Sequence, residues 1–466
     1  MMFFFSIFTS LLLGLLSCLI FFKEKKNLNF RFLLNLSLPI GMGISSVIFI
    51  SLTLFGLSFF LISLIEIALI IFLVFKVKDT KKLIDQFEWF NLDKLLLSPI
   101  LLLLTVIYFY AWLMDSGIFY FDSIKEPHGL WDAWNYWNLK AKIISRAPNY
   151  WPHVLHQMGS DDFHPDYPLL QTGYVARCWL YIKNESVWIP IVVCYIFTFC
   201  TIGLLASSVS IFTNKTKGFI AGLILLCTPF YMTMGDSQYA DNTVGFFYLA
   251  TIILLTFARR EASIKPQLLI AAGITAGLSA WSKNEGLLFI VCLFSSQLTL
   301  LFFKNYRELL TEFKYLFLGM LPILLLIAYY KIKIAPPNDL VNAQGAQTFI
   351  KLADFSRYAT VSKWYMEQFS TFGKWVLNPW WLFLFGILYK GISIKGNKYS
   401  LISNFTLFLL MLIGFFFIYI ITPLDLVFHL STSIHRLFFQ LFPVFIFIYF
   451  LAIKGNSPIR KPASLT

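Results

Sequence analysis

The sequence predicts an all-α polytopic membrane protein with about thirteen transmembrane helices. Of its 466 residues, 58% are hydrophobic and 13% are charged, and the mean hydropathy is +0.73. A water-soluble domain of this length cannot bury that much apolar surface, so lipid must cover much of it. In addition, the apolar residues form stretches long enough to cross a bilayer, and the basic residues gather in alternate loops between those stretches.

Apolar stretches of about 17 to 25 residues give the expected positions of the spans. The first has neither a basic leader nor a small-residue cleavage site, so we expect it to be retained as a helix. Residues 166–183 are also apolar, but their charged residues make a crossing costly, which favours a juxtamembrane helix in the interface. The expected spans are 3–22, 32–52, 57–76, 95–114, 187–212, 217–234, 242–259, 267–283, 286–303, 315–334, 374–390, 401–422 and 436–453.

The distribution of Lys and Arg predicts the orientation, because basic residues in short loops tend to stay in the cytoplasm. Seven alternate loops contain 23 of the 37 basic residues but only 8 of the 24 acidic ones. The N-terminus is then outside and the C-terminus inside. The net charge of +13 is thereby explained as an orientation signal, and no nucleic-acid partner is predicted. Two long outer loops, 115–186 and 335–373, place the expected function on the non-cytoplasmic face.

The first long outer loop is rich in aromatic and ionisable residues, and contains WDAWNYWNLKAK at 131–142 and HPDYPLL at 164–170. Trp131, Trp134 and Trp137 recur every three residues, which predicts one helix face at the membrane interface. Asp132 lies one step round from that stripe. It either caps and solvates this helix or, partly desolvated at the water–lipid boundary, serves as a general base for an acceptor hydroxyl that attacks a sugar.

Four motifs in order, WDAWNYWNLKAK, HPDYPLL, QYADNTVGFFYLAT and GLSAWSKNEGLLF, resemble the motif series of the GT-C membrane glycosyltransferases. That group includes bacterial aminoarabinose transferases and protein O-mannosyltransferases. The resemblance covers roughly residues 95–303. It implies a GT-C-like catalytic module at 95–303 with outer loop 115–186, preceded by extra transmembrane helices at 1–94. A C-terminal transmembrane region at 304–466, with outer loop 335–373, follows.

The resemblance also implies roles for individual acids. The catalytic Asp of the group's first large outer loop is best matched by Asp132, with Tyr136 one turn later. The second acidic position is matched by Asp241 or, less closely, by Asp236. The group's basic-Pro motif is loosely matched at His164 and Pro165, where His replaces the usual Lys.

The group's later Lys-containing turn resembles Ser282-Lys283-Asn284. Lys283 and Glu285 either neutralise each other or leave Lys283 to contact a lipid phosphate. Arg436, at the outer start of the last helix, is a similar candidate or a snorkelling interfacial residue. The predicted substrate-binding residues are Lys283, Glu285, His164, Asp166, Arg436 and His435.

Two further groups of ionisable residues permit more than one interpretation. Glu66, within the third span, is either a helix-packing residue or a functional intramembrane acid. A second group can bind a divalent cation in principle, but its spacing matches no compact metal motif, which favours a solvated polar loop. That group is His153, His156, Asp161, Asp162, His164 and Asp166.

The resemblance implies a multi-pass glycosyltransferase of the bacterial inner membrane that moves a sugar from a polyprenyl-phosphate carrier to an acceptor. Asp132 would be the general base, and Asp241 or Asp236 would orient the sugar or acceptor. The expected partners are the lipid-linked donor and membrane lipids; the acceptor stays open, and Tyr358, Trp364 and Tyr365 are expected to cover its side. Two alternatives are a glycan flippase, which would have mid-membrane ionisable residues and pseudo-symmetric halves, and a polysaccharide polymerase or ligase.

Overall fold

The computed structural model describes residues 2–23, 28–77, 87–88, 98–158, 163–303, 305–337, 346–374, 379–394 and 396–454. Within these ranges the chain is overwhelmingly helical, apart from a two-residue parallel pairing of β1 (Leu28–Asn29) with β2 (Phe87–Glu88) and one isolated bridge. The predicted class, an all-α polytopic membrane protein, is confirmed.

Within the described ranges, ten helices are long and apolar enough to cross a membrane. Apart from the fully buried Ala240–Ala258, their apolar faces turn partly outward, with many exposed Phe, Leu and Ile side chains, as lipid contact requires. They are α1 (Met2–Phe21), α2 (Phe30–Leu54), α3 (Phe59–Lys76), α6 (Pro99–Lys125), α11 (Trp188–Phe212), α14 (Ala240–Ala258), α16 with its 3-10 extension η3 (Glu285–Phe302), α17 (Tyr306–Lys333), α22 (Lys398–Ile421) and α23 (Leu426–Ala452).

The predicted count of thirteen is not confirmed, because three expected spans fall short of a straight apolar crossing. Helices α12 (Lys215–Leu226) and α13 (Pro229–Asp236) form a pair bent by 65°, which raises the count to eleven if it is one span. The bend follows from Pro229, since a proline disfavours helical geometry in the residue before it. Helix α15 (Lys265–Ser282) is less apolar, and α21 (Pro379–Lys390) has only 12 residues.

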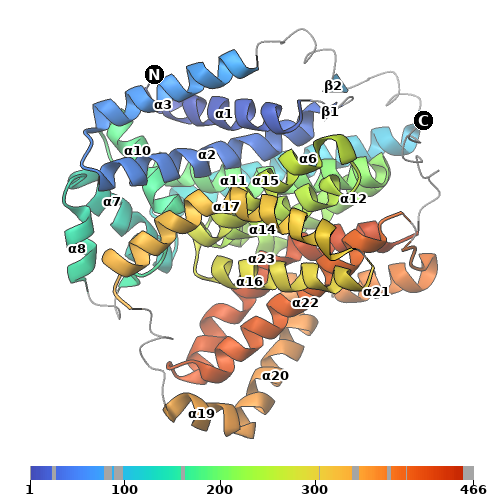
Figure 1. Ribbon diagram of the computed structural model, residues 1–466. Helices are drawn as coiled ribbons and strands as arrows, with labels where there is room; N and C mark the ends of the chain where they lie inside the picture. Colours follow the sequence, from blue (N-terminus) through green and yellow to red (C-terminus); the bar gives the residue numbers. More distant parts are fainter. Residues whose placement is uncertain are drawn as a thin grey trace.

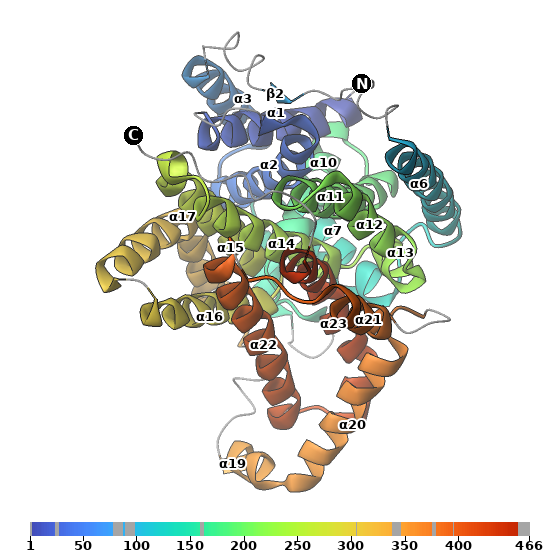
Figure 2. The ribbon, with the colours of Figure 1, turned by 90° about the vertical axis from the view of Figure 1, so that its right-hand side faces the viewer.

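The long helices run side by side, with the short helices α7 (Asn138–Arg146) and α8 (Trp151–Gln157) at one end of the bundle and β1 and β2 at the other (Figure 1). Every residue of α14 is buried, and α14 packs against α11, α15 and α23. Helices α19 (Ala346–Ala353), α20 (Phe355–Thr371) and part of α22 project from the bundle (Figure 2).

The segment predicted to lie in the interface forms helix α10 (Leu170–Ile182), but protein encloses it. Its residues 170–179 are all buried, and it packs against α1, α2 and α7. Arg177 lies 2.6 Å from the Glu66 carboxylate of α3 and donates to Thr9 of α1. The costly charge is therefore compensated inside the protein, and Glu66 acts in helix packing.

The tryptophans at positions 131, 134 and 137 do not share one face as predicted. Trp131 and Trp134 are exposed and their rings meet edge to face, whereas Trp137 is buried and stacks on Tyr167. The reason is that residues 133–137 form a π-helical turn, η1 (Ala133–Trp137). A π turn is wider than an α turn, so a three-residue spacing no longer keeps side chains on one face.

Candidate functional site

Two acids far apart in the sequence meet on one arginine. Arg436 Nη1 lies 2.6 Å from Asp132 Oδ2, and its Nη2 lies 2.8 Å from Asp241 Oδ2. Asp132 immediately precedes η1, Asp241 is the second residue of α14, and Arg436 is in α23. Three separate parts of the chain thus form one ionic cluster at the end of the bundle that carries α7.

Asp241 is the most enclosed member of this cluster, with no exposed surface. Besides Arg436, it accepts hydrogen bonds from Lys283 at 3.0 Å and from the Gln440 amide at 2.7 Å. It also lies in the first turn of α14, where the helix dipole favours a negative charge. Asp241 is therefore held as a fixed carboxylate. In this position it can orient the side chains of Arg436 and Lys283.

Hydrogen bonds between two turns, at residues 129–132 and 237–239, hold Asp132 beside Arg436. The Leu130 amide donates to the Ser237 carbonyl at 3.1 Å, and the Asp132 amide donates to the Tyr239 hydroxyl at 3.3 Å. Gly129 adopts φ +74, and a Cβ there would lie 2.6 Å from the Ser237 oxygen. Only glycine fits such a close approach without strain.

Gln238 fixes the turn that precedes α14. Its side chain accepts from the Asn138 amide at 2.9 Å, and its carbonyl accepts from the Gln171 amide at 2.8 Å. Gln238 itself has φ +61 and is buried. Buried amide networks of this kind are rigid when every member is paired, so the turn before α14 is tied both to α7 and to α10.

Lys283 lies at the tight turn between α15 and α16. Its ammonium is 2.8 Å from Glu285 Oε1 as well as 3.0 Å from Asp241. Although burial alone would lower the pKa of Lys283, the carboxylates of Asp241 and Glu285 raise it above its ordinary value. The predicted Lys283–Glu285 pair is present, and Asp241 is a second carboxylate on the same ammonium. A Cβ at Gly286 would collide with the Ser279 carbonyl, which explains the glycine in this turn.

A second polar cluster lies beside the first, around Asp166. Asp166 accepts from the Asn284 amide at 2.8 Å, and its backbone oxygen accepts from Lys331 of α17. Lys331 also donates to Asn284 Oδ1 at 2.7 Å. His164 Nδ1 is 3.8 Å from Asp166, and its ring stacks on Tyr167. Asn284 therefore connects this cluster to the Lys283 turn.

Lys140 is a buried lysine that contacts no carboxylate among the described residues. It donates to the His164 carbonyl at 3.0 Å, and its ammonium lies 4.9 Å from the Trp137 ring centroid. Burial lowers the pKa of Lys140 to about 7. This residue, like Lys331 and Gln440, was not singled out by the sequence analysis.

Two predicted site residues lie apart from the ionic cluster. Asp236 is half-buried at the end of α13, and among the described residues no hydrogen bond or ion pair connects its side chain to Arg436. The His435 ring packs edge-on against Phe230, with centroids 5.6 Å apart. In α20, the Tyr365 hydroxyl donates to the Leu412 carbonyl at 2.9 Å, which fixes it against α22.

Within the part of the chain that the structure describes, no three His, Cys, Asp or Glu side chains are grouped so that they could hold a metal ion. Asp161 and Asp162, from the polar stretch weighed as a metal site, lie outside the described residues.

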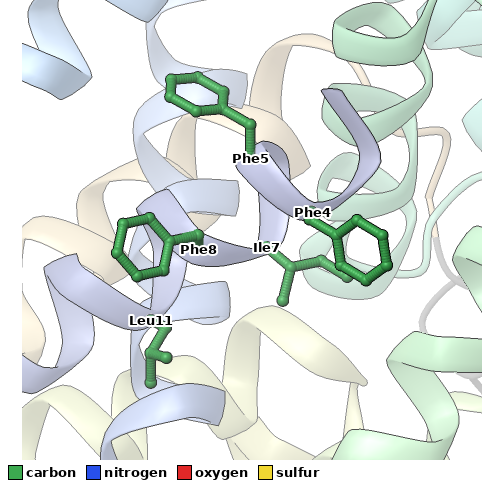
Figure 3. Close-up of a pocket in the computed structure, with 5 residues that line it drawn as sticks. All are labelled: Phe4, Phe5, Ile7, Phe8 and Leu11. Atoms are coloured by element: carbon green, nitrogen blue, oxygen red, sulfur yellow. The ribbon is translucent and has the colours of Figure 1, made fainter. Parts of the chain in front are cut away.

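The outer side of α1 has an open hollow of about 480 Å³ lined by Phe4, Phe5, Ile7, Phe8 and Leu11 (Figure 3). It offers no polar group for chemistry and suits contact with lipid chains.

Residues 164–330 match the family model described as dolichyl-phosphate-mannose-protein mannosyltransferase. The chain resembles GT-C glycosyltransferases there. The matched segment contains His164, Asp166, Asp241 and Lys283, whereas Asp132 and Arg436 lie outside it. This match confirms the resemblance on which the site was predicted, and with the apolar helices it supports a multi-pass membrane glycosyltransferase. No curated protein and no solved structure matches the chain.

Proposed function

We propose that the chain transfers a sugar from a polyprenyl-phosphate carrier to an acceptor hydroxyl at the non-cytoplasmic face of the bacterial inner membrane. The observation that carries the proposal is the Asp132–Arg436–Asp241 cluster, which joins the two acids matched to the GT-C motifs. The family match over residues 164–330 supports glycosyl transfer and a lipid-linked donor.

Asp132 is the general base in this proposal. Its side chain is 15% exposed, whereas that of Asp241 has no exposed surface, so Asp132 is the acid of the pair that an acceptor can reach. Arg436 holds one oxygen of the Asp132 carboxylate and leaves the other for a proton. A positioned carboxylate of this kind contributes about 10²–10⁴-fold to a proton-transfer step.

The reaction is a direct displacement at the anomeric carbon. Asp132 takes the proton from the acceptor hydroxyl as its oxygen forms a bond to that carbon. The bond between the anomeric carbon and the phosphate oxygen breaks, and the lipid phosphate leaves with the electron pair. A single displacement inverts the configuration of the sugar.

Glu285 orients the sugar and acceptor, whereas Asp241, which has no exposed surface, acts indirectly by fixing Arg436 and Lys283. Asp241 is fixed by Arg436, Lys283 and Gln440, so its position changes little between substrates. Two buried acceptor atoms, Glu285 Oε2 and Gln440 Oε1, have no hydrogen-bond donor among the described residues. Sugar hydroxyls supply such donors, and an unpaired buried acceptor rejects a ligand that lacks them.

The test uses purified full-length protein and a panel of polyprenyl-phosphate sugars, with and without acceptor preparations. The measurement is release of free polyprenyl phosphate together with sugar transfer, for the wild type and Asp132→Asn. Transfer of a sugar that needs Asp132 supports the proposal. Full activity in Asp132→Asn would exclude this base, and lipid movement across vesicles without sugar release would identify a flippase instead.

A further inference from the structure

The charges around Asp132 leave little room for another anion. Three carboxylates, Asp132, Asp241 and Glu285, are paired with two cations, Lys283 and Arg436, so this cluster has an excess of negative charge. The Lys283 side chain is only 4% exposed. A phosphate placed at these two cations would have to displace carboxylates that already hold them, at a cost in buried charge.

The neighbouring cluster has no such excess of negative charge. Here one carboxylate, Asp166, faces Lys331, and Lys140, whose pKa burial lowers to about 7, adds only part of a positive charge. Lys140 is fully enclosed, whereas the Lys331 side chain is 24% exposed and is therefore the cation that a ligand can reach. The closest carboxylate oxygen in its ion pair, Asp166 Oδ2, is 3.7 Å away, beyond hydrogen-bond distance.

The hydrogen bonds of Lys331 leave it one donor for a ligand. An ammonium group has three N–H donors. One donates to Asn284 Oδ1 at 2.7 Å and one to the Asp166 backbone oxygen, and among the described residues neither a third hydrogen bond nor a closer carboxylate takes the last. The two hydrogen-bond partners are neutral, so they hold the ammonium in place without cancelling its charge, and the carboxylate of its ion pair stays 3.7 Å away.

We infer that the phosphate of the lipid-linked donor binds at Lys331, while Lys283 and Arg436 hold the carboxylates of Asp241 and Asp132. The inference rests on the proposed function and states where the phosphate group of the lipid-linked donor binds. Lys331 is not in any of the motifs that predicted the site, and it lies one residue beyond the matched family segment.

The two clusters are close enough to serve one donor molecule. Tyr167 contacts both regions, because its ring stacks on His164, next to Asp166, and on Trp137, in the η1 turn that follows Asp132. Asn284 contacts Lys331 and Asp166 while its neighbours Lys283 and Glu285 belong to the other cluster. A phosphate at Lys331 therefore leaves the attached sugar toward Glu285 and the acceptor beside Asp132.

The experiment measures equilibrium binding of a polyprenyl monophosphate and of the uncharged polyprenol of the same chain length to the detergent-solubilised full chain. The quantity of interest is the phosphate preference, which is the Kd of the polyprenol divided by the Kd of the polyprenyl monophosphate. Lys331→Gln should lower it about tenfold or more, because a charge-assisted hydrogen bond is lost. Lys331→Arg keeps the charge and should stay within about threefold. Lys333→Gln removes an exposed charge from the same helix and should change nothing.

The outcomes distinguish a failure of the proposed function from a failure of the inference about Lys331. A wild-type protein without any phosphate preference would overturn both the function and the inference. A preference that Lys331→Gln retains, or that Lys333→Gln loses equally, would overturn the inference alone. If Lys331→Gln does not fold, Lys331→Cys is measured before and after a thiol-directed reagent adds an aminoethyl group. Recovery of the preference supports Lys331, and no recovery rejects it; treated wild type controls for the exposed Cys227.

Discussion

Two arginine–carboxylate pairs in this protein have the same length but different surroundings. Arg177–Glu66 and Arg436–Asp132 both measure 2.6 Å. The first pair is sealed, with side chains 1% and 2% exposed, while those of the second are 14% and 15% exposed. Arg177 also donates to the backbone oxygen of Ser6, so its pair fastens α1 and α3 to α10. The exposed fraction of the side chains, and not the distance between nitrogen and oxygen, distinguishes the structural pair from the candidate site.

A third pair completes the series. Arg146 and Glu185 are also 2.6 Å apart, but their side chains are 69% and 27% exposed. Water screens such a surface pair, which contributes little to stability. The three pairs allow the same chemical change, carboxylate to amide, to be compared at three degrees of burial.

The largest expected effect is on catalysis, at the partly exposed Arg436–Asp132 pair. Asp132→Asn should reduce sugar transfer by about 10²–10⁴-fold, because the amide cannot accept the acceptor proton. The thermal unfolding midpoint should stay close to that of the wild type, since Arg436 keeps Asp241 as a partner. Asp122→Asn, the same change at an exposed position on α6, is the control and should keep full activity. A large loss of stability in Asp132→Asn would instead make Asp132 a structural residue.

The next effect is on stability at the sealed pair. Glu66→Gln should cost about 3–5 kcal/mol in the free energy of unfolding, because it leaves the Arg177 charge buried without its counter-ion. Activity per folded molecule should not change. Chemical denaturation monitored by tryptophan fluorescence measures the first quantity.

The double variant Glu66→Leu with Arg177→Met sharpens this result. Replacing both buried charges by apolar groups removes the desolvation cost together with the attraction, so its stability should lie near that of the wild type. Wild-type stability in Glu66→Gln alone would contradict the idea that this pair fastens the N-terminal helices.

A smaller effect concerns pH. Because the pKa of Lys140 is lowered to about 7 in the folded protein, the unfolded chain binds more protons between pH 7 and the ordinary lysine pKa. The contribution of this residue to stability therefore rises with pH across that window. In Lys140→Met this rise should disappear. The check is the difference in unfolding midpoint between variant and wild type at pH 7 and pH 9, with the more exposed Lys142→Met as control; equal slopes would refute a neutralised Lys140.

The smallest effect is expected at the exposed pair. Glu185→Gln should shift the unfolding midpoint little, and the shift should vanish in high salt, which screens surface charges. Parallel unfolding curves at low and high salt test this. A loss as large as that of Glu66→Gln would show that burial is not what separates the three pairs.

Much of the fold follows from the sequence, because a bilayer imposes a minimum apolar length on each crossing. Departures arise where local chemistry overrides hydropathy. Pro229 breaks the α12–α13 segment, the π turn directs Trp137 inward, and Arg177 is enclosed because Glu66 compensates it. Hydropathy does not report such pairings, since they depend on which helices become neighbours.

The candidate site was predictable in its acids and less so in its other members. Motif order identified Asp132 and Asp241, but Asp236 and Asp241 flank one short turn, and only the packing of α23 shows which one reaches Arg436. Gln440 did leave a signal, as a single amide in the apolar run LFFQLFPVF, where a polar residue is costly. Lys331 looked like any basic residue at the end of a span.

The sealed Arg177–Glu66 pair also sets an order for biogenesis. Glu66 enters the membrane 111 residues ahead of Arg177 in the chain. At about 5–20 residues per second of synthesis, the carboxyl waits roughly 5–20 s for its partner. During that interval α1, α2 and α3 can pack only against one another, and the Glu66 carboxyl is without the cation that it has in the complete fold.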